Sequence, residues 1–441
     1  MILHIFSAKV NRGMYILIQA IFKEKVGIHI NSSKNFDENQ TIAKAIRPGD
    51  KLPFGQLLIL GIQHAFTMFG ATVLVPIITG LSVSVSLFTA GIGTLWFHLV
   101  TNRKVPIFLG SSFAFIAPVE LVVREMGIPA AQGGIIVAGL LYCIMAGLIA
   151  LLGPKFMESL LPPIITGPII MVIGLNLAPV AIESASQSWL IAIIVLAVVA
   201  YVNLYVKGFM RLLPVISGII VGYILSLLAG IVDLTPIKEA AWFAVPDFSW
   251  PVFDMAAIGL IAPVAIASMV EHVGDVLAVG ATVEQDFIKE PGLSRTLIGD
   301  GIATTLAGIV GGPANTTYSE NTGVLALTRV WKPEVMRIAA VIAIGLSFVQ
   351  KLGAAIRTIP DPVIGGISIV LFGMIASVGV RTVVENQIDF KQPRNLFISS
   401  IILVVGIGGA IVKLWGGIQI GGMGLAAILG IILNQILPKE S

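Results

Sequence analysis

Long apolar runs alternate with short polar interruptions along the chain from Leu57 onward. A helix needs about 20 apolar residues to cross a bilayer core of about 30 Å, and by this criterion the pattern predicts about fourteen membrane-spanning segments. They are expected near residues 57–78, 84–100, 107–124, 132–152, 162–181, 188–206, 213–231, 256–280, 296–310, 314–329, 335–352, 362–380, 396–412 and 421–437. The chain is therefore predicted to be an all-α polytopic membrane protein.

The first fifty residues have a different pattern, because they are rich in Lys, Asn and Asp and contain one short apolar patch, Met14 to Phe22. This patch is about half the length of a span, and no small-residue cleavage site follows it. We therefore expect residues 1–50 to form a cytoplasmic tail. Most Lys and Arg residues of the short loops fall on the same side of the membrane as this tail. This bias predicts that both termini are cytoplasmic and that the number of spans is even.

Composition supports a membrane protein and excludes several other classes. The 441 residues are 56% hydrophobic and 12% charged, with a mean hydropathy of +0.97. The net charge of +3 comes without a basic block, so no nucleic-acid partner is expected. The single cysteine, Cys143, excludes an intramolecular disulfide and a CxxC metal site. No HExxH, GxSxG or Walker A motif is present, so we expect neither an enzyme nor a cofactor nor a metal.

Three pairs of short motifs recur in the same order in the two halves of the chain. Leu161 to Gly167 resembles Ile359 to Gly366, Gly91 to Thr94 resembles Gly301 to Thr304, and Gln63-His64 resembles Glu271-His272. The offsets are similar, at roughly 200 residues, which predicts two repeats of seven spans each. Because seven is odd, the second repeat must enter the membrane from the opposite side, which makes an inverted repeat.

The third and tenth spans are expected to begin in non-helical backbone. The third opens at Gly110 with small residues, and the tenth opens at Gly312 and Pro313, which disfavour continuous helix. We expect two short helices, each preceded by an extended stretch, that meet near the middle of the membrane. Irregular backbone is tolerated at that depth only inside protein or beside a cavity, where peptide N–H groups can face a ligand.

Three carboxylic acids lie within predicted spans: Glu271, Asp275 and Glu320. Glu271 and Asp275 are four residues apart, so they share a helix face. A charged group at the bilayer centre costs about 2.5–3.5 kcal/mol on insertion scales, so a functional role is the default interpretation. Burial and mutual repulsion favour the uncharged form of such acids, which suits a proton-coupled carrier. The alternative is that each acid only bonds a neighbouring helix, and this alternative is strongest for Asp275.

His64 and His272 could each bond a neighbouring helix or contact a ligand. A histidine in a polytopic bundle more commonly bonds a neighbouring helix than a ligand. His98, near a helix end and Arg103, is expected at the membrane interface, and Asp300 is expected to cap or bond a neighbouring helix.

A family resemblance rests on a signature in the tenth span, formed by Glu320, Asn321, Gly323, Thr328 and Arg329. The pair Gln63-His64 in the first span and the stretch from Gly110 to Phe115 match the same family. By these motifs the region from about Leu52 to Leu437 resembles the nucleobase/ascorbate transporter family, of the nucleobase:cation symporter-2 type, and within it the bacterial uracil permeases.

The resemblance implies fourteen spans divided into a core and a gate domain. The core domain would comprise residues 51–155 (spans 1 to 4) and 255–355 (spans 8 to 11). The gate domain would comprise residues 156–254 (spans 5 to 7) and 356–441 (spans 12 to 14). The resemblance also implies a homodimer that associates through the gate domains, in the inner (plasma) membrane.

The resemblance further implies which residues bind substrate. Glu271 and Glu320 would bind the pyrimidine ring, and backbone groups of Phe113 and Ser319 would complete its edge. Gln63, His64, His272 and Asn321 would support the site or take part in proton coupling. Glu at position 320, where purine carriers tend to have Gln, favours uracil over xanthine or uric acid, which remain the nearest alternative. An inorganic-anion transporter on the same fold would need a neutral or cationic centre.

One departure from the family concerns Asp275. Relatives often have a histidine four residues after the acid of the eighth span, where it takes part in proton coupling. This chain has Asp275 there. Proton symport is still expected, and the coupling residue stays open among Glu271, Asp275 and Glu320.

Overall fold

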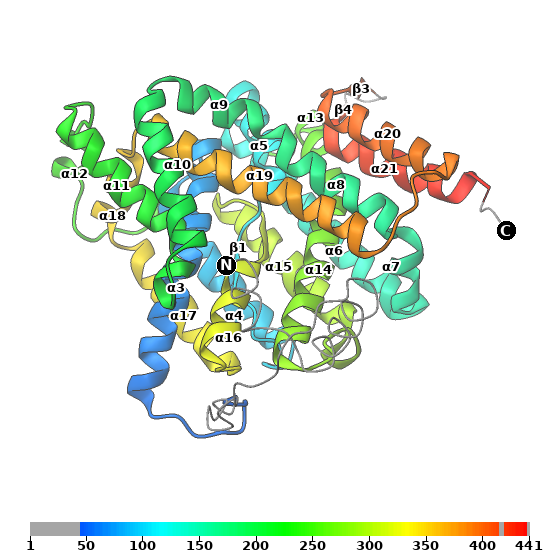
Figure 1. Cartoon of the computed structure of the whole chain (residues 1–441), viewed down its shortest axis with the longest axis horizontal. Coiled ribbons are helices and arrows are strands. Elements are labelled where there is room, and N and C mark those ends of the chain that lie inside the picture. Colours follow the sequence, from blue (N-terminus) through cyan, green and yellow to red (C-terminus); the bar gives the residue numbers. More distant parts are fainter. Residues whose placement is uncertain (1–44, 414–418, 439–441) are drawn as a thin grey trace, which may run out of the picture. The chain divides into compact units, whose positions relative to one another are not determined.

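The computed structural model describes residues 45–413 and 419–438. The apolar patch from Met14 to Phe22, and most of the expected tail, lie outside the described residues. Residues from Ala45 onward form one compact unit, and this unit is mostly helical (Figure 1).

The helices follow the predicted apolar runs closely. In chain order they are α3 (Phe54–Thr79), α4 (Val83–Val100), α5 (Ile116–Met126), α6 (Ile128–Leu152), α7 (Pro154–Leu160), α8 (Pro163–Asn176), α9 (Ala178–Ser186), α10 (Trp189–Leu204), α11 (Pro214–Leu228), α12 (Thr235–Glu239), α13 (Met255–Ile261), α14 (Ala265–Val283), α15 (Leu293–Val310), α16 (Ser319–Thr328), α17 (Pro333–Ser347), α18 (Gln350–Arg357), α19 (Asp361–Glu385), α20 (Pro393–Ile407) and α21 (Gly422–Ile436), with the short turns η1 (Phe113–Phe115), η2 (Phe209–Leu212), η3 (Ala262–Val264) and η4 (Ile288–Gly292).

Three predicted spans are broken. Residues 162–181 form α8 and α9, residues 256–280 form α13, η3 and α14, and residues 335–352 form α17 and the start of α18. Pro179 and Pro263 lie at the first two of these breaks. Proline has no N–H to continue the helical ladder, so the helix is interrupted there.

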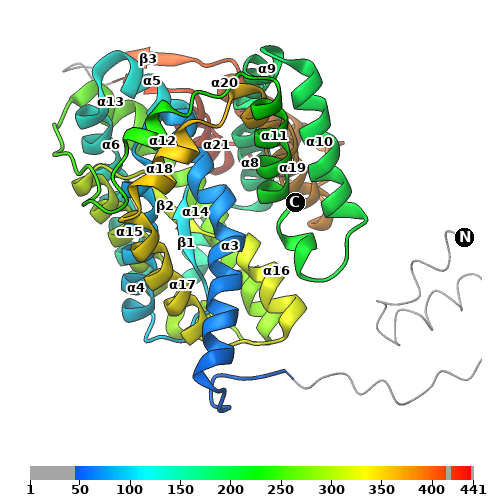
Figure 2. The ribbon, with the colours of Figure 1, turned by 90° about the vertical axis from the view of Figure 1, so that its left-hand side faces the viewer.

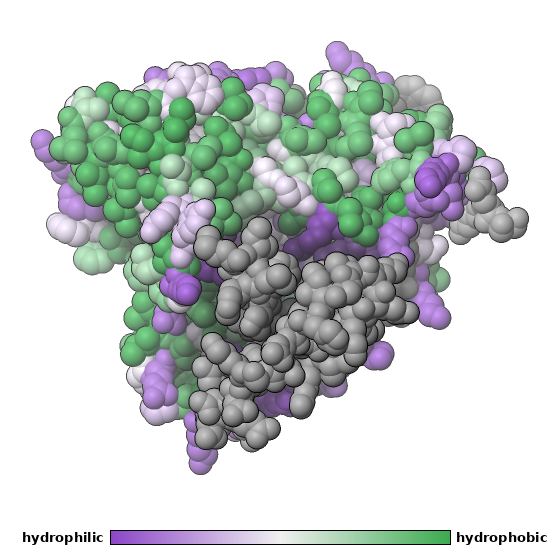
Figure 3. All heavy atoms as spheres, viewed as in Figure 1, coloured by the Kyte–Doolittle hydropathy of each residue, from purple (hydrophilic) through white to green (hydrophobic). Residues whose placement is uncertain are grey.

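Six helical stretches within the described residues are long and apolar enough to cross a membrane. They are Phe54–Thr79, Val83–Val100, Ile128–Leu152, Pro163–Ser186, Met255–Val283 and Asp361–Glu385. Four shorter apolar helices, α10, α11, α20 and α21, accompany them. Large apolar side chains such as Ile193, Leu228 and Val404 are exposed, and apolar side chains cover much of the face over α10, α11 and α20 (Figure 3). Such a surface suits contact with hydrocarbon, and the chain is a multi-pass membrane protein.

The helices pack in two groups, called the first and the second helix group. In the first helix group, α6 packs on α15, α4 packs on α15 and α17, and α3 packs on α17. In the second helix group, α8 packs on α19 and α20, α10 on α11 and α19, and α20 on α21. Both groups use glycine at their closest crossings: a Cβ atom added at Gly301 would lie 2.7 Å from the Gly139 carbonyl oxygen, and one at Gly379 would lie 2.6 Å from that of Gly167. Small residues at these crossings let the backbones approach closely.

Two short strands lie at the centre of the first helix group. β1 (Leu109–Ser111) pairs antiparallel with β2 (Asn315–Thr317), with Gly110 opposite Thr316. All residues of both strands are buried. The prediction of extended stretches before the helices now identified as α5 and α16 is confirmed. A second antiparallel pair, β3 (Ile411–Lys413) with β4 (Gln419–Gly421), connects α20 to α21.

Two equivalent threonines hold the first residue of each central strand. The hydroxyl of Thr94 accepts from the Leu109 N–H (2.9 Å) and lies 3.3 Å from the Leu109 carbonyl oxygen. The hydroxyl of Thr304 lies 3.2 Å from the Asn315 nitrogen and donates to its carbonyl oxygen at 2.9 Å. Thr94 and Thr304 are the ends of the motifs recognised as repeats in the sequence, so matching residues make matching contacts.

Candidate functional site

Two helices begin next to the central strands. β1 leads into η1 and α5, and β2 leads directly into α16. The residues that precede η1 and α16, Ser112 and Tyr318, make no side-chain capping hydrogen bond. The first N–H groups of a helix have no partner within the helix, and they attract acceptor groups of a ligand. The arrangement therefore offers backbone donors at two nearby points.

Tyr318 connects the end of β2 to β1 and to the residue before it by two hydrogen bonds. Its hydroxyl donates to the Ser111 carbonyl oxygen at 3.0 Å, and its N–H donates to the Phe108 carbonyl oxygen at 3.0 Å. A Cβ atom added at Gly110 would lie 2.3 Å from the Tyr318 ring, which is far inside van der Waals contact. Gly110 is therefore required so that the ring can lie across β1.

The carboxyl groups predicted to be functional gather beside these strands. Glu271 and Asp275 lie on α14, and Thr317 of β2 donates a hydrogen bond to Asp275 at 2.8 Å. Glu320 lies in the first turn of α16. Glu271 is close enough to Glu320 and to Asp300 for their charges to interact. Its Oε2 atom is buried and has no hydrogen-bond partner among the described residues, so it is available to a ligand that donates a hydrogen bond.

The histidines bond to neighbouring helices. The Asn321 side-chain amide of α16 donates to the Nδ1 atom of His64 (3.0 Å) and to its carbonyl oxygen (3.2 Å) on α3. His272 Nδ1 lies 2.9 Å from Asp300 Oδ2 of α15, and both side chains are fully buried. Both histidines thus have the interhelical role that the sequence allowed, and Asp300 bonds a neighbouring helix as expected. Gln63 lies beside His64 with its buried Oε1 atom unpartnered among the described residues.

One cavity borders the start of α16. Its volume is about 280 Å³, and it is lined by Ser319, Glu320 and Gly323 of α16 together with parts of α3, η2 and the second helix group, namely Phe66, Thr67, Gly70, Ala71, Val199, Asn203, Arg211, Leu212, Leu213, Pro214, Val215, Ile216, Val370, Leu371 and Met374. Figure 2 shows α16 next to α3, with α10, α11 and α19 of the second helix group on the same side of α3. Ser319 and Glu320 therefore open into a space between the two helix groups.

Phe113 and Glu271 do not line this cavity. Phe113 is almost fully buried, and its ring meets the edge of Phe372 of α19, with 6.4 Å between centroids and 72° between planes. The predicted substrate residues thus fall into two pairs: Ser319 and Glu320 line the cavity, while Phe113 and Glu271 lie outside its lining.

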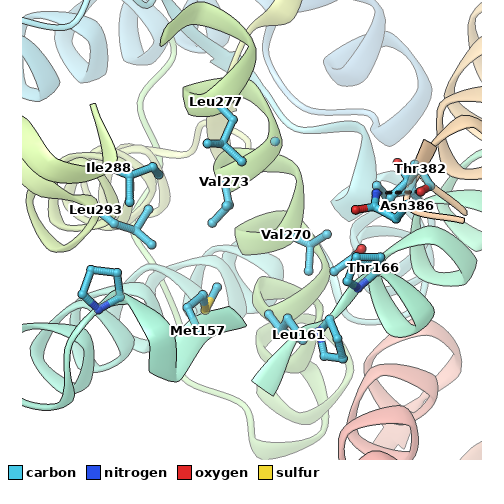
Figure 4. Close-up of a pocket in the computed structure, with 15 residues that line it drawn as sticks. Met157, Leu161, Thr166, Val270, Val273, Leu277, Ile288, Leu293, Thr382 and Asn386 are labelled. Atoms are coloured by element: carbon cyan, nitrogen blue, oxygen red, sulfur yellow. Dashed lines mark hydrogen bonds between the residues drawn. The ribbon is translucent and has the colours of Figure 1, made fainter. Parts of the chain in front are cut away.

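A second cavity, of about 370 Å³, borders another face of α14 (Figure 4). Val270, Val273 and Leu277 of α14 face Met157, Leu161 and other apolar residues across it. Its polar side chains are Thr166, Thr382 and Asn386, and the Asn386 amide donates to the Thr382 carbonyl oxygen at 2.8 Å. Among the side chains that the structure describes, no carboxyl group lines this cavity, so the cavity beside Glu320 is better suited to a polar ligand.

His98, expected at the membrane interface, is fully buried inside the protein in the last turn of α4, and its Nε2 atom lies 2.9 Å from the Ile107 carbonyl oxygen. After α4 the chain turns back through Val105 to Phe108, all of them buried, on its way to β1. This returning segment covers the end of α4, a contact between elements that a linear pattern does not contain.

Asp300 is more central than the sequence suggested. It is fully buried, it holds His272, and its charge acts on Glu271. An acid within an apolar span was the available signal, but its partner could be found only from the structure. Among the described residues, no group of three or more His, Cys, Asp or Glu side chains could hold a metal ion.

Comparisons with known proteins identify the relatives of this chain. A family profile described as "Permease family" matches residues 55–414. The uracil permease of Bacillus subtilis (strain 168) is 46% identical over 398 residues, which cover 86% of this chain and 92% of that protein. The uracil permease of Bacillus caldolyticus is 45% identical over 404 residues, covering 88% and 94%.

Solved structures resemble this one in fold. The murine Solute Carrier 26 family member A9 anion transporter, in the inward-facing state, aligns with a TM-score of 0.66 at 9% sequence identity. The alignment covers 95% of this chain and 74% of that chain. At this identity the likeness concerns the fold alone.

Proposed function

This chain belongs to the permease family, and from this premise we propose that it is a secondary active transporter that imports uracil. Permeases are transport proteins, so the sequence-based expectation that the chain is not an enzyme is confirmed. Relatives named uracil permease are 45–46% identical over most of their length, which supports a nucleobase as the substrate.

The observation that carries the proposal is the pair of carboxyl groups beside the uncapped start of α16. Glu320 opens into the cavity, and the buried Glu271 Oε2 atom has no partner among the described residues. Uracil has two N–H donors and two carbonyl acceptors. The carboxyl groups would accept from the N–H donors, and backbone N–H groups near Phe113 and Ser319 would donate to the carbonyls. A cavity of about 280 Å³ leaves room for one planar ring and several waters.

Two alternatives use the same scaffold. A permease for xanthine or uric acid would share every motif and differ in its preference at position 320. An inorganic-anion transporter would need a centre that attracts negative charge, whereas Glu271, Asp275, Asp300 and Glu320 interact as a cluster of acids. Carboxyl groups supply no positive charge that would attract an anion, so the acids argue against this alternative.

The experiment that tests the function uses purified full-length protein in proteoliposomes. Labelled uracil should accumulate when the outside is acidified, and a protonophore should abolish the accumulation but leave counterflow of uracil intact. Unlabelled xanthine and uric acid should compete weakly. Uptake that is blocked by purines and not by uracil would replace uracil with a purine as substrate. Absence of counterflow with every nucleobase would overturn the proposed function.

We further propose fourteen spans in two inverted repeats, with a core of residues 51–155 and 255–355 and a gate of residues 156–254 and 356–441. In the proposed repeats α4 corresponds to α15, α6 to α17, α8 to α19 and α10 to α20. Helix contacts support this division, because each contact recurs when every helix is replaced by its counterpart. The contact of α6 with α15 corresponds to that of α17 with α4, and the contact of α10 with α19 corresponds to that of α20 with α8. The equivalent bonds of Thr94 and Thr304 support the same symmetry.

Alternating access would follow from movement of the core against the gate. The cavity beside Glu320 and the cavity beside α14 are each lined by residues of both proposed domains. The boundary between core and gate is therefore not fully packed at these two places. Transport would then expose the α16 site to one side of the membrane at a time. Both termini would be cytoplasmic, and dimerisation would occur through the gate domains.

Asp275 is proposed to serve proton coupling rather than uracil binding. It bonds Thr317 on the strand that leads into α16, and it interacts electrostatically with Glu271. Asp275→Asn keeps a group that can accept from Thr317 but cannot ionise. We expect uracil counterflow within about twofold of wild type and loss of most pH-driven accumulation, measured in the same vesicles. Unchanged accumulation across a pH gradient would leave Asp275 with a purely structural role.

A further inference from the structure

The chain immediately before α3 is bound to the connection that follows α16. Ile46 forms a parallel bridge with Val330: its N–H donates to the Arg329 carbonyl oxygen, and its carbonyl oxygen accepts from the Trp331 N–H, both at 2.9 Å. Residues 45–50, here called the strap, thus add a short extended segment beside residues 329–332. These residues were expected to belong to the tail, but they pack against the unit that holds the site.

Lys332 fixes the strap from the other side. Its side chain is only 7% exposed, and its ammonium group donates to the carbonyl oxygens of Pro48 (2.7 Å) and Asp50 (2.8 Å). Glu334 Oε2 lies 3.9 Å away, and Glu334 is shared with Arg337. Burying an ammonium group is costly unless its donors are satisfied. The two strap carbonyls satisfy donors that would otherwise be buried without partners.

The strap also reaches α14. Arg47 lies 5.7 Å above the Trp331 ring, and its guanidinium pairs at 3.0 Å with Glu284, the residue that ends α14 in a left-handed conformation. The Arg47 backbone N–H donates to Asp50 at 2.7 Å, which closes the turn of the strap. Residues 45–50 therefore connect the start of α3 with the ends of α14 and α16. These three helices carry His64, Glu271 and Glu320.

We propose that the strap and Lys332 position α16, and thereby set the affinity of the site for nucleobase. α16 is short, with ten residues. Its first end is held by the pairing of β2 with β1, and its other end is held by the strap. Loss of the strap contacts would let α16 tilt about β2 and move Glu320 and Asn321 relative to Glu271 and His64. Lys332 is a positioning residue in this view, since it does not contact the cavity. The inference rests on the proposed function.

The test compares Lys332→Met with Lys332→Arg and with a matched lysine elsewhere. Lys351 also donates to a backbone carbonyl oxygen, that of Ile237 in α12, at 2.7 Å, and it lies 5.4 Å over Trp242, but none of these residues belongs to α16 or the strap. Uracil counterflow would be measured against concentration in proteoliposomes containing known amounts of each protein. We expect Lys332→Met to raise KM about tenfold, with Vmax per protein within about twofold, because displacement of a binding group by about 1 Å is enough for such an effect. Lys332→Arg should recover most of the affinity, and Lys351→Met should match wild type within about twofold.

Two results would overturn the proposal: an unchanged KM in Lys332→Met, or an equal rise of KM in Lys351→Met. Arg47→Gln provides a second variant if Lys332→Met does not fold, because Arg47 is exposed and its loss removes the link to Glu284 and the contact with the Trp331 ring, while the backbone bonds of the strap remain. It should raise KM about threefold, and a wild-type KM in this variant would also count against the strap. Failure of the wild-type protein to transport uracil would instead refute the function on which the inference rests.

Discussion

Glu320→Gln should lower the efficiency of uracil transport by at least about 100-fold, because the substitution places amide donors where the ring N–H groups need an acceptor. Gln has the same shape as Glu, so the packing of Ser319 and Asn321 around it should persist. The measurement is kcat/KM for uracil counterflow in proteoliposomes. Xanthine should be tested in parallel, since carriers of the family with Gln at this position tend to take purines. A gain of xanthine uptake would support the role of position 320 in the choice between uracil and purines.

The matched control for this substitution is Glu120→Gln. Glu120 lies on α5, the other helix that starts beside the central strands, but it pairs with Arg124 at 3.4 Å and does not line the cavity. It should transport uracil within about twofold of wild type, because a partly exposed ion pair contributes little. Normal uracil transport by Glu320→Gln, with its fold intact, would remove the central element of the proposed mechanism.

Glu271→Gln should have the second largest effect, a loss of uracil affinity of about 10 to 100-fold. The reason differs from that for Glu320. Glu271 Oε2 is buried without a partner among the described residues, so the substitution breaks no hydrogen bond of the free protein at this atom. The cost arises when a ligand N–H approaches and meets the amide nitrogen instead of an oxygen.

Equilibrium binding of labelled uracil to the purified variant would measure this loss directly, without a contribution from transport. Thermal stability of the ligand-free Glu271→Gln protein should stay close to that of wild type, because Gln has the shape of Glu and the Oε2 position has no hydrogen-bond partner among the described residues to lose. Wild-type binding by this variant would restrict Glu271 to a structural role beside Asp300.

Much of this fold could be predicted from periodicity and composition. Apolar runs gave the helices, and the motifs that end at Thr94 and Thr304 gave residues that prove equivalent in their contacts. The extended stretches at Gly110 and before Glu320 followed from small residues and Pro313, which disfavour helix in a place where backbone groups must still be paired. These are local signals, so a linear pattern contains them.

The sequence could not indicate which residues meet across elements. Asp300 was recognised as a buried acid, but its partnership with His272 depends on how α14 and α15 pack. The burial of His98 was not evident either, because the segment that covers it comes from the turn back towards β1. The strap was missed because residues 45–50 share the polar composition of the tail, and their order arises from Lys332 and Trp331, which lie far away in the chain.

The pairing of β1 with β2 also bears on how the protein is made. Ser111 and Tyr318 are 207 residues apart, so the first strand must enter the membrane long before its partner has been synthesised. Until then the backbone groups of β1 lack their final partners, which is unfavourable in hydrocarbon. Contacts of such long range form late in folding. Pairing of the two strands should therefore be among the last steps in the assembly of the inserted chain.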